Sequence, residues 1–173
     1  MSRRRPDEAA QNLLDKYSVA HAPVPVEKIA ASEGAEIVRQ RSEGQESGFA
    51  LRMDGRWIIG INTQTSRLRQ RFSVAHELGH LLLHEGKPLI VSSARIDLRD
   101  SVSSMGTNTE EIEANRFAAE LLMPRALVIH AFEVKLRKSV SSRDELVSEL
   151  AHEFDVSTDA MGYRLINLGI LTA

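Results

Sequence analysis

Residues 73–84 constrain this chain more than any other stretch, because they read Ser-Val-Ala-His-Glu-Leu-Gly-His-Leu-Leu-Leu-His. On a helix, at about 100° per residue, His76 and His80 lie one turn apart on the same face. The opposite face carries an apolar stripe made of Val74, Leu78, Leu81 and Leu82. One side of the predicted helix can therefore pack into a core while the other directs two imidazoles toward one point.

The pattern His-Glu-x-x-His is the signature of zinc peptidases. Two imidazole nitrogens on a rigid helix suit Zn²⁺, and a catalytic site needs one more protein ligand and an open position for water. Glu77 lies between the histidines, where its carboxylate can take a proton from that water. The alternative is an amphipathic helix with surface histidines, but the pattern should arise by chance in well under roughly one in a hundred chains this long. We therefore favour a metal site.

The third metal ligand is expected in a second helix, predicted over residues 110–122. Glu113 lies on the apolar face of that helix, where a carboxylate is costly unless it is paired or bound to a metal. Glu110 shares this face, but residues 107–110, Thr-Asn-Thr-Glu, fit a capping box that explains its carboxylate. Glu111 has the same explanation, with Asn108 as the cap. Glu113 is therefore the favoured ligand, and Glu110 is the alternative.

The remaining polar residues near the motif have less specific roles. His84 continues the histidine face and is a candidate to contact a metal ligand or the reacting carbonyl, although a helix-capping or surface role explains it equally well. His84 and Tyr163 are the candidates for stabilising an oxyanion. Arg71, about one turn before His76, is a candidate partner for a carboxylate rather than a catalytic group.

Composition excludes several classes of protein. The 173 residues suit one ordinary domain, and their net charge of -2 gives no global reason to bind nucleic acid. There is no cysteine, so a disulfide framework and a thiolate metal site are excluded. The basic start is not followed by the apolar region of a signal peptide, and no apolar run is long enough to span a membrane. A cytoplasmic protein is the expectation.

Periodicity and turn residues predict an α+β fold with a short mixed or antiparallel sheet. Asp54-Gly55 is typical of the tight turn of a hairpin, here between strands at 49–53 and 56–62. The second of these strands is either an ordinary core strand or the sheet edge on which an extended peptide pairs. The other expected elements are helices at 7–20, 27–33 (ending at Gly34), 67–84, 110–122 and 124–138, strands at 35–39 and within 88–100, and two helices within 141–173, separated by residues 154–157.

Two separated segments together resemble the ImmA/IrrE family of metallo-endopeptidases. The first, residues 71–84, contains His-Glu-Leu-Gly-His, and the second, residues 111–124, reads Glu-Ile-Glu-Ala-Asn-Arg-Phe-Ala-Ala-Glu-Leu-Leu-Met-Pro. The segment 150–157 and the residues after it fit the same pattern, so the resemblance runs from about residue 20 to the C-terminus.

This resemblance implies a small zincin-like peptidase domain, with His76, His80 and Glu113 as metal ligands and Glu77 as general base. Zn²⁺ is the expected metal, and Mn²⁺ tolerates the same ligands. The resemblance also implies cleavage of a helix-turn-helix repressor of the XRE type, which derepresses genes. We expect the peptidase domain to span residues 1–138, with the C-terminal helical segment, 139–173, packed on it or forming a partner surface.

The competing hypothesis is a DNA-binding or toxin–antitoxin-type regulator that keeps a structural metal. Two helices joined by a short turn within residues 146–168 have the outline of a helix-turn-helix. However, residues 139–173 contain two basic and six acidic residues, and a phosphate-binding surface needs the opposite charge. Direct binding of nucleic acid is therefore disfavoured, and the intact Glu77 argues for an enzyme.

Overall fold

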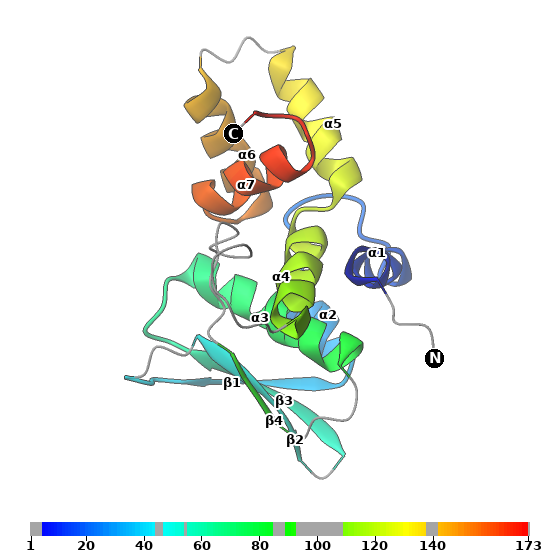
Figure 1. The fold of residues 1–173 in the computed structure, drawn as a ribbon, viewed down its shortest axis with the longest axis vertical. Coiled ribbons are helices and arrows are strands. Elements are labelled where there is room, and N and C mark those ends of the chain that lie inside the picture. Colours follow the sequence, from blue (N-terminus) through cyan, green and yellow to red (C-terminus); the bar gives the residue numbers. More distant parts are fainter. Residues whose placement is uncertain are drawn as a thin grey trace.

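The computed structural model describes residues 5–43, 47–53, 55–84, 89–92, 109–137 and 142–172. Within these residues, seven helices and one four-stranded sheet form the predicted α+β fold. Figure 1 shows the sheet at one end, helices α3 (Arg67–Leu83) and α4 (Thr109–Leu122) in the middle, and α5 to α7 at the far end. None of the helices described here is long and apolar enough to cross a membrane.

The sheet is mixed, which is one of the two predicted arrangements. Strand β3 runs parallel to β1 and antiparallel to β2, and β2 is also antiparallel to β4, which gives the order β1-β3-β2-β4. The strands are β1 (Ala35–Gln40), β2 (Gly48–Met53), β3 (Arg56–Asn62) and β4 (Leu89–Ser92). Strand β4 is the one predicted within residues 88–100; the rest of that range lies outside the described residues.

The predicted hairpin is confirmed, since Met53 pairs with Arg56 in antiparallel register. Gly55 has a φ of 78°, which glycine adopts without steric cost; Asp54 lies outside the described residues. The hypothesis that the second strand is a free sheet edge is wrong, because β1 covers its other side. It is a core strand, with Ile59 and Ile61 buried.

The other helices follow the predictions with small changes at their ends. The first ends four residues early because Ser18 adopts a left-handed φ of 51°, and Gly34 follows α2 with a φ of 87°, as expected of a C-terminal cap. The capping box expected at 107–110 involves residues outside the described range. The bounds are α1 (Pro6–Lys16), α2 (Val26–Ser32), α5 (Arg125–Leu136), α6 (Arg143–Phe154) and α7 (Thr158–Asn167).

Helix α3 is buried more completely than the sequence suggested. It begins at Ser66, whose side chain accepts a hydrogen bond from the backbone N–H of Arg69 at 3.3 Å. From Phe72 to Leu81 every residue is buried, so both the apolar stripe and the histidine face are covered. Helix α4 packs along α3 and covers the histidine face.

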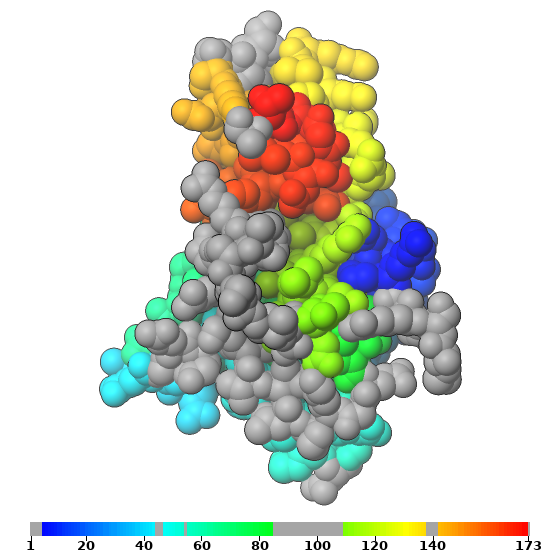
Figure 2. Space-filling model, in the orientation of Figure 1, coloured from blue at the N-terminus to red at the C-terminus, as the bar shows by residue number. Residues whose placement is uncertain are grey.

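The packing of α3 on α4 depends on a close approach at Gly79. A Cβ atom at this position would lie 2.9 Å from Cδ1 of Phe117 and 3.3 Å from Cα of Ala114, both of which are fully buried. Only glycine lets the two backbones approach this closely without displacing neighbours. Helix α4 also packs against α1, whose atoms form the dark blue region in Figure 2. Arg116 of α4 donates two hydrogen bonds to Asp7 of α1.

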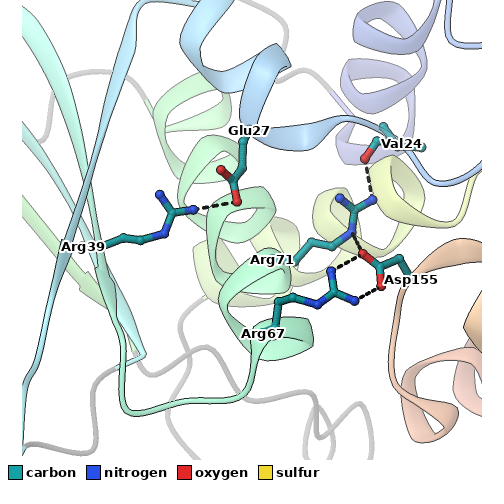
Figure 3. Close-up of polar contacts among 6 residues, drawn as sticks. All are labelled: Val24, Glu27, Arg39, Arg67, Arg71 and Asp155. Carbon is teal, nitrogen blue, oxygen red and sulfur yellow. Dashed lines mark hydrogen bonds and ion pairs between the residues drawn. The ribbon is translucent and has the colours of Figure 1, made fainter.

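The C-terminal helices are joined to α3 by a cluster of charged side chains (Figure 3). Asp155, in the turn between α6 and α7, accepts two hydrogen bonds from Arg67, one of them 2.6 Å long, and lies 3.7 Å from Nε of Arg71. Arg71 also donates to the carbonyl oxygen of Val24. Arg71 therefore pairs with a carboxylate, as the sequence suggested. A second, buried contact connects α7 to the end of α4, where Arg164 donates hydrogen bonds to Glu120 and to the carbonyl oxygen of Met123.

Replacing Asp155 with asparagine tests the ion pair between Asp155 and Arg67. Asparagine tolerates the left-handed φ of 56° at this position but carries no charge. The hydrogen bonds from Arg67 lower the pKa of Asp155 below its ordinary value of 3.8. Since the folded pKa is lower than the unfolded one, the interaction stabilises the fold above about pH 4, and this stabilisation is lost as the pH falls through the lowered pKa. We expect Asp155→Asn to reduce the Tm at neutral pH, with a difference from the wild type that shrinks below about pH 4.

Thermal unfolding followed by circular dichroism across this pH range measures the effect. Asp15→Asn, at an exposed carboxylate on α1, is the control. A Tm difference for Asp155→Asn that is the same at every pH would contradict the ion-pair explanation.

Candidate metal centre

His76 and His80 project from the same face of α3, one turn apart, as their spacing predicted. Both residues are fully buried. Their Nε2 atoms lie 3.0 Å apart, so the two imidazoles point toward a common centre. Two nitrogen donors are thus held on one rigid helix, close enough to bind a single ion.

Glu111 of α4 provides the third donor at this centre. One carboxylate oxygen lies 3.2 Å from Nε2 of His76 and the other lies 3.1 Å from Nε2 of His80. In a tetrahedral site with bonds of about 2.1 Å, neighbouring donors are about 3.4 Å apart, so these separations fit a small divalent ion. Two imidazoles and one carboxylate are also the donor set of a catalytic zinc site with an open fourth position.

Glu113 does not take the position expected of the third ligand. Its Oε2 lies 3.0 Å from Nε2 of His84, at the C-terminal end of α3. Glu111 and Glu113 are about 200° apart around α4 at 3.6 residues per turn, and α4 packs so that Glu111 faces the two motif histidines. The apolar stripe used to choose Glu113 identifies the buried side of α4, but not which edge of that side meets the histidines. Glu110 is likewise not one of the three grouped donors.

The charges at the centre suit metal binding. Burial raises the pKa of Glu111 on its own, but the adjacent imidazoles of His76 and His80 outweigh it, so the pKa lies well below its ordinary value. Burial is the main cause that lowers the pKa of His80, against the opposing effect of Glu111. An ionised carboxylate and a neutral imidazole are the protonation states that a metal ion requires of its ligands.

Glu77 is also fully buried, on the turn of α3 that carries His76. Its carboxylate reaches the start of β2, since a Cβ atom added at Gly48 would lie 3.2 Å from Oε1 of Glu77. The same atom would lie 2.9 Å from the carbonyl oxygen of Gly60. The glycine at position 48 therefore leaves space for this carboxylate between α3 and the sheet.

The outer ring nitrogens of the histidines have partners that the sequence only partly indicated. Nδ1 of His76 lies 2.8 Å from Oδ1 of Asn115, and Nδ1 of His80 lies 3.1 Å from Nδ1 of His84. His84 was expected as one candidate contact of a ligand. Asn115 was missed, although its position four residues after Glu111 places both on one face of α4. Because His80 and Glu113 occupy both nitrogens of His84, it is not placed to stabilise an oxyanion.

Comparison with known proteins gives two matches. A model of the peptidase family Peptidase_M78, described as the IrrE N-terminal-like domain, matches residues 30–166. The chain is also 26% identical over 150 residues to a protein of Bacillus phage phi105 named "Uncharacterized immunity region protein 2", a match that covers 86% of this chain and 88% of the phage protein.

Removing the charge of Glu111 tests the third donor. We expect Glu111→Gln to weaken Zn²⁺ binding by more than the roughly 10–100-fold typical of an outer partner of a ligand, because a neutral amide oxygen is a poor donor. Glu110→Gln, one residue earlier on α4, is the matched control and should bind Zn²⁺ like the wild type. Equilibrium dialysis with metal analysis measures both. Loss of metal from Glu110→Gln alone would show that Glu111 is not the ligand.

Proposed function

Because the chain belongs to the Peptidase_M78 family of IrrE N-terminal-like domains, we propose that it is a metal-dependent endopeptidase. His76, His80 and Glu111 are the proposed metal ligands, and Glu77 is the proposed general base. The observation that carries this proposal is that donor atoms of His76, His80 and Glu111 all lie within 4.8 Å of one another. The part of α3 that carries the two histidines also carries the buried Glu77. A structural metal site would not need that glutamate.

Zn²⁺ is the proposed metal. Imidazole and carboxylate donors at these separations suit it, and Mn²⁺ accepts the same ligands. Three protein donors are grouped within the described residues, which supports a site with room for water or substrate.

A bound metal ion would polarise the scissile carbonyl and make a water molecule acidic. Glu77 takes the proton of the attacking water and passes it to the leaving amine. The neighbouring glycine at position 48 lets the Glu77 carboxylate lie against β2. Strand β4 is outermost among the described strands on this side of β2, and its backbone is the proposed edge for an extended peptide.

A repressor of the XRE type is the proposed substrate. The name of the phage relative refers to an immunity region, which supports a substrate among regulatory proteins. The C-terminal helices add a second argument, since their exposed charged side chains are mainly acidic and DNA-binding repressors are basic. The exposed acidic residues on α6 and α7 are Asp144, Glu145, Glu149, Glu153 and Asp159. The same charge disfavours DNA itself as a partner.

Replacing Glu77 with glutamine separates catalysis from metal binding. We expect Glu77→Gln to retain roughly one metal ion per chain and to lose at least about 100-fold in peptidase activity, the lower end of general-base effects. Metal analysis and a cleavage assay on the same preparation measure both quantities. Full activity in this variant would remove Glu77 from the mechanism.

The substrate proposal is tested by incubating the metal-loaded protein with the XRE-type repressor encoded nearest to it. We expect cleavage at one or two sites in an exposed linker or helix, mapped by mass spectrometry, with weak activity on casein. The Glu77→Gln protein is the control for contaminating proteases. Rapid digestion of casein with the repressor left intact would overturn the proposal of a dedicated regulatory protease.

A further inference from the structure

The Nδ1 atoms of His76 and His80, on the side of each ring away from the metal centre, contact side chains that the catalytic mechanism does not use. His76 contacts Asn115, while His80 contacts His84, which in turn contacts Glu113. The chain from His80 is well shielded, since the side chain of His84 is 4% exposed and that of Glu113 is 18% exposed. Groups buried this way form hydrogen bonds whose directions matter, because an unmatched donor or acceptor there is costly.

The partner of His76 determines which of its nitrogens carries the proton. Oδ1 of Asn115 is an amide oxygen and can only accept, so Nδ1 of His76, 2.8 Å away, must donate. In a neutral imidazole the other nitrogen then has a free lone pair. That nitrogen is Nε2, which points toward His80 and Glu111.

The same reasoning applies to the series of hydrogen bonds from His80 through His84 to Glu113, starting at Glu113. The carboxylate of Glu113 accepts, so Nε2 of His84, 3.0 Å away, donates. Nδ1 of a neutral His84 is then an acceptor and takes the hydrogen of Nδ1 of His80, 3.1 Å away. This leaves the lone pair of Nε2 of His80 directed at the centre. All three hydrogen bonds are satisfied by this single arrangement of protons.

We propose that Asn115 and the His84–Glu113 pair are positioning residues that fix His76 and His80 in the tautomer whose Nε2 binds the metal. The inference rests on the ligand set of the proposed function. Glu113 thus acts on the metal through two successive imidazoles, His84 and His80, and not as a ligand. A carboxylate at the end of such a chain also makes the ligating imidazole a stronger donor.

A purely structural explanation is that these contacts only fasten α3 to α4. The two explanations differ in what conservative substitutions do. Glu113→Gln and Asn115→Asp each keep an oxygen that accepts from the same imidazole, whereas Glu113→Ala and Asn115→Ala remove the acceptor. If the contacts position the ligands, metal affinity follows the presence of the acceptor and not the stability of the apo-protein.

The experiment measures the Zn²⁺ dissociation constant of each full-length variant by competition with a chromophoric chelator, together with the Tm of the apo-protein. We expect Glu113→Ala and Asn115→Ala each to weaken binding by about 10–100-fold, and the conservative variants to recover most of the loss. The double variant His84→Ala/Glu113→Ala should bind no more weakly than the weaker of its two single variants, because both act through one chain. Ile112→Ala, at an exposed position between Glu111 and Glu113, is the matched control and should bind like the wild type.

Nitrogen-15 NMR of the histidine rings gives a second readout that fastening alone would not change. In the wild type we expect Nδ1 of His76 and of His80 to carry the proton, and Asn115→Ala to produce a mixture of tautomers at His76. Wild-type affinity and unchanged tautomers in Glu113→Ala and Asn115→Ala would overturn the positioning proposal. That result would leave the proposed function standing if Glu111→Gln still loses the metal, whereas wild-type metal affinity in Glu111→Gln would overturn the ligand set itself.

Discussion

The close contact of α3 with α4 at Gly79 is the constraint on which the rest of the structure depends. A side chain at this position would collide with Phe117 and with the backbone of Ala114. Because position 79 carries no side chain, α4 lies close enough to α3 for the side chains of the two helices to meet. Helix α4 contributes Glu111 at the metal centre, Asn115 behind His76 and Glu113 behind His84, so this contact sets how far these three side chains lie from the histidines of α3.

The same contact buries ionisable side chains in the core, which carries a desolvation cost. Three ionisable residues of α3, His76, Glu77 and His80, are fully buried in the middle of the fold. Burying such groups without partners costs several kcal/mol, so an arrangement of matched donors and acceptors is required. Glu111 and Asn115 of α4, together with His84 at the end of α3, supply it for both imidazoles. In return, the low local dielectric strengthens each polar interaction, which favours tight binding of an ion and a well-defined geometry.

The C-terminal helices depend on the same two helices. Asp155 ties the turn between α6 and α7 to the first turn of α3, and Arg164 ties α7 to the end of α4. A partner that bound α6 and α7 would therefore contact elements joined directly to both helices that carry the metal centre. This arrangement connects the acidic surface of the protein to the site where the proposed chemistry occurs.

The sequence by itself determined the elements whose causes are local. Hydrophobic periodicity, capping residues and the turn at Gly55 predicted the helices and the hairpin, and the four-residue spacing of His76 and His80 fixed their common face because a helix repeats every 3.6 residues. Only the tertiary structure decided that β3 is a core strand and that Glu111, not Glu113, faces His76 and His80. The physical reason is that these choices depend on which strand pairs with which and on how two helices cross, and both are set by packing between residues far apart in the chain.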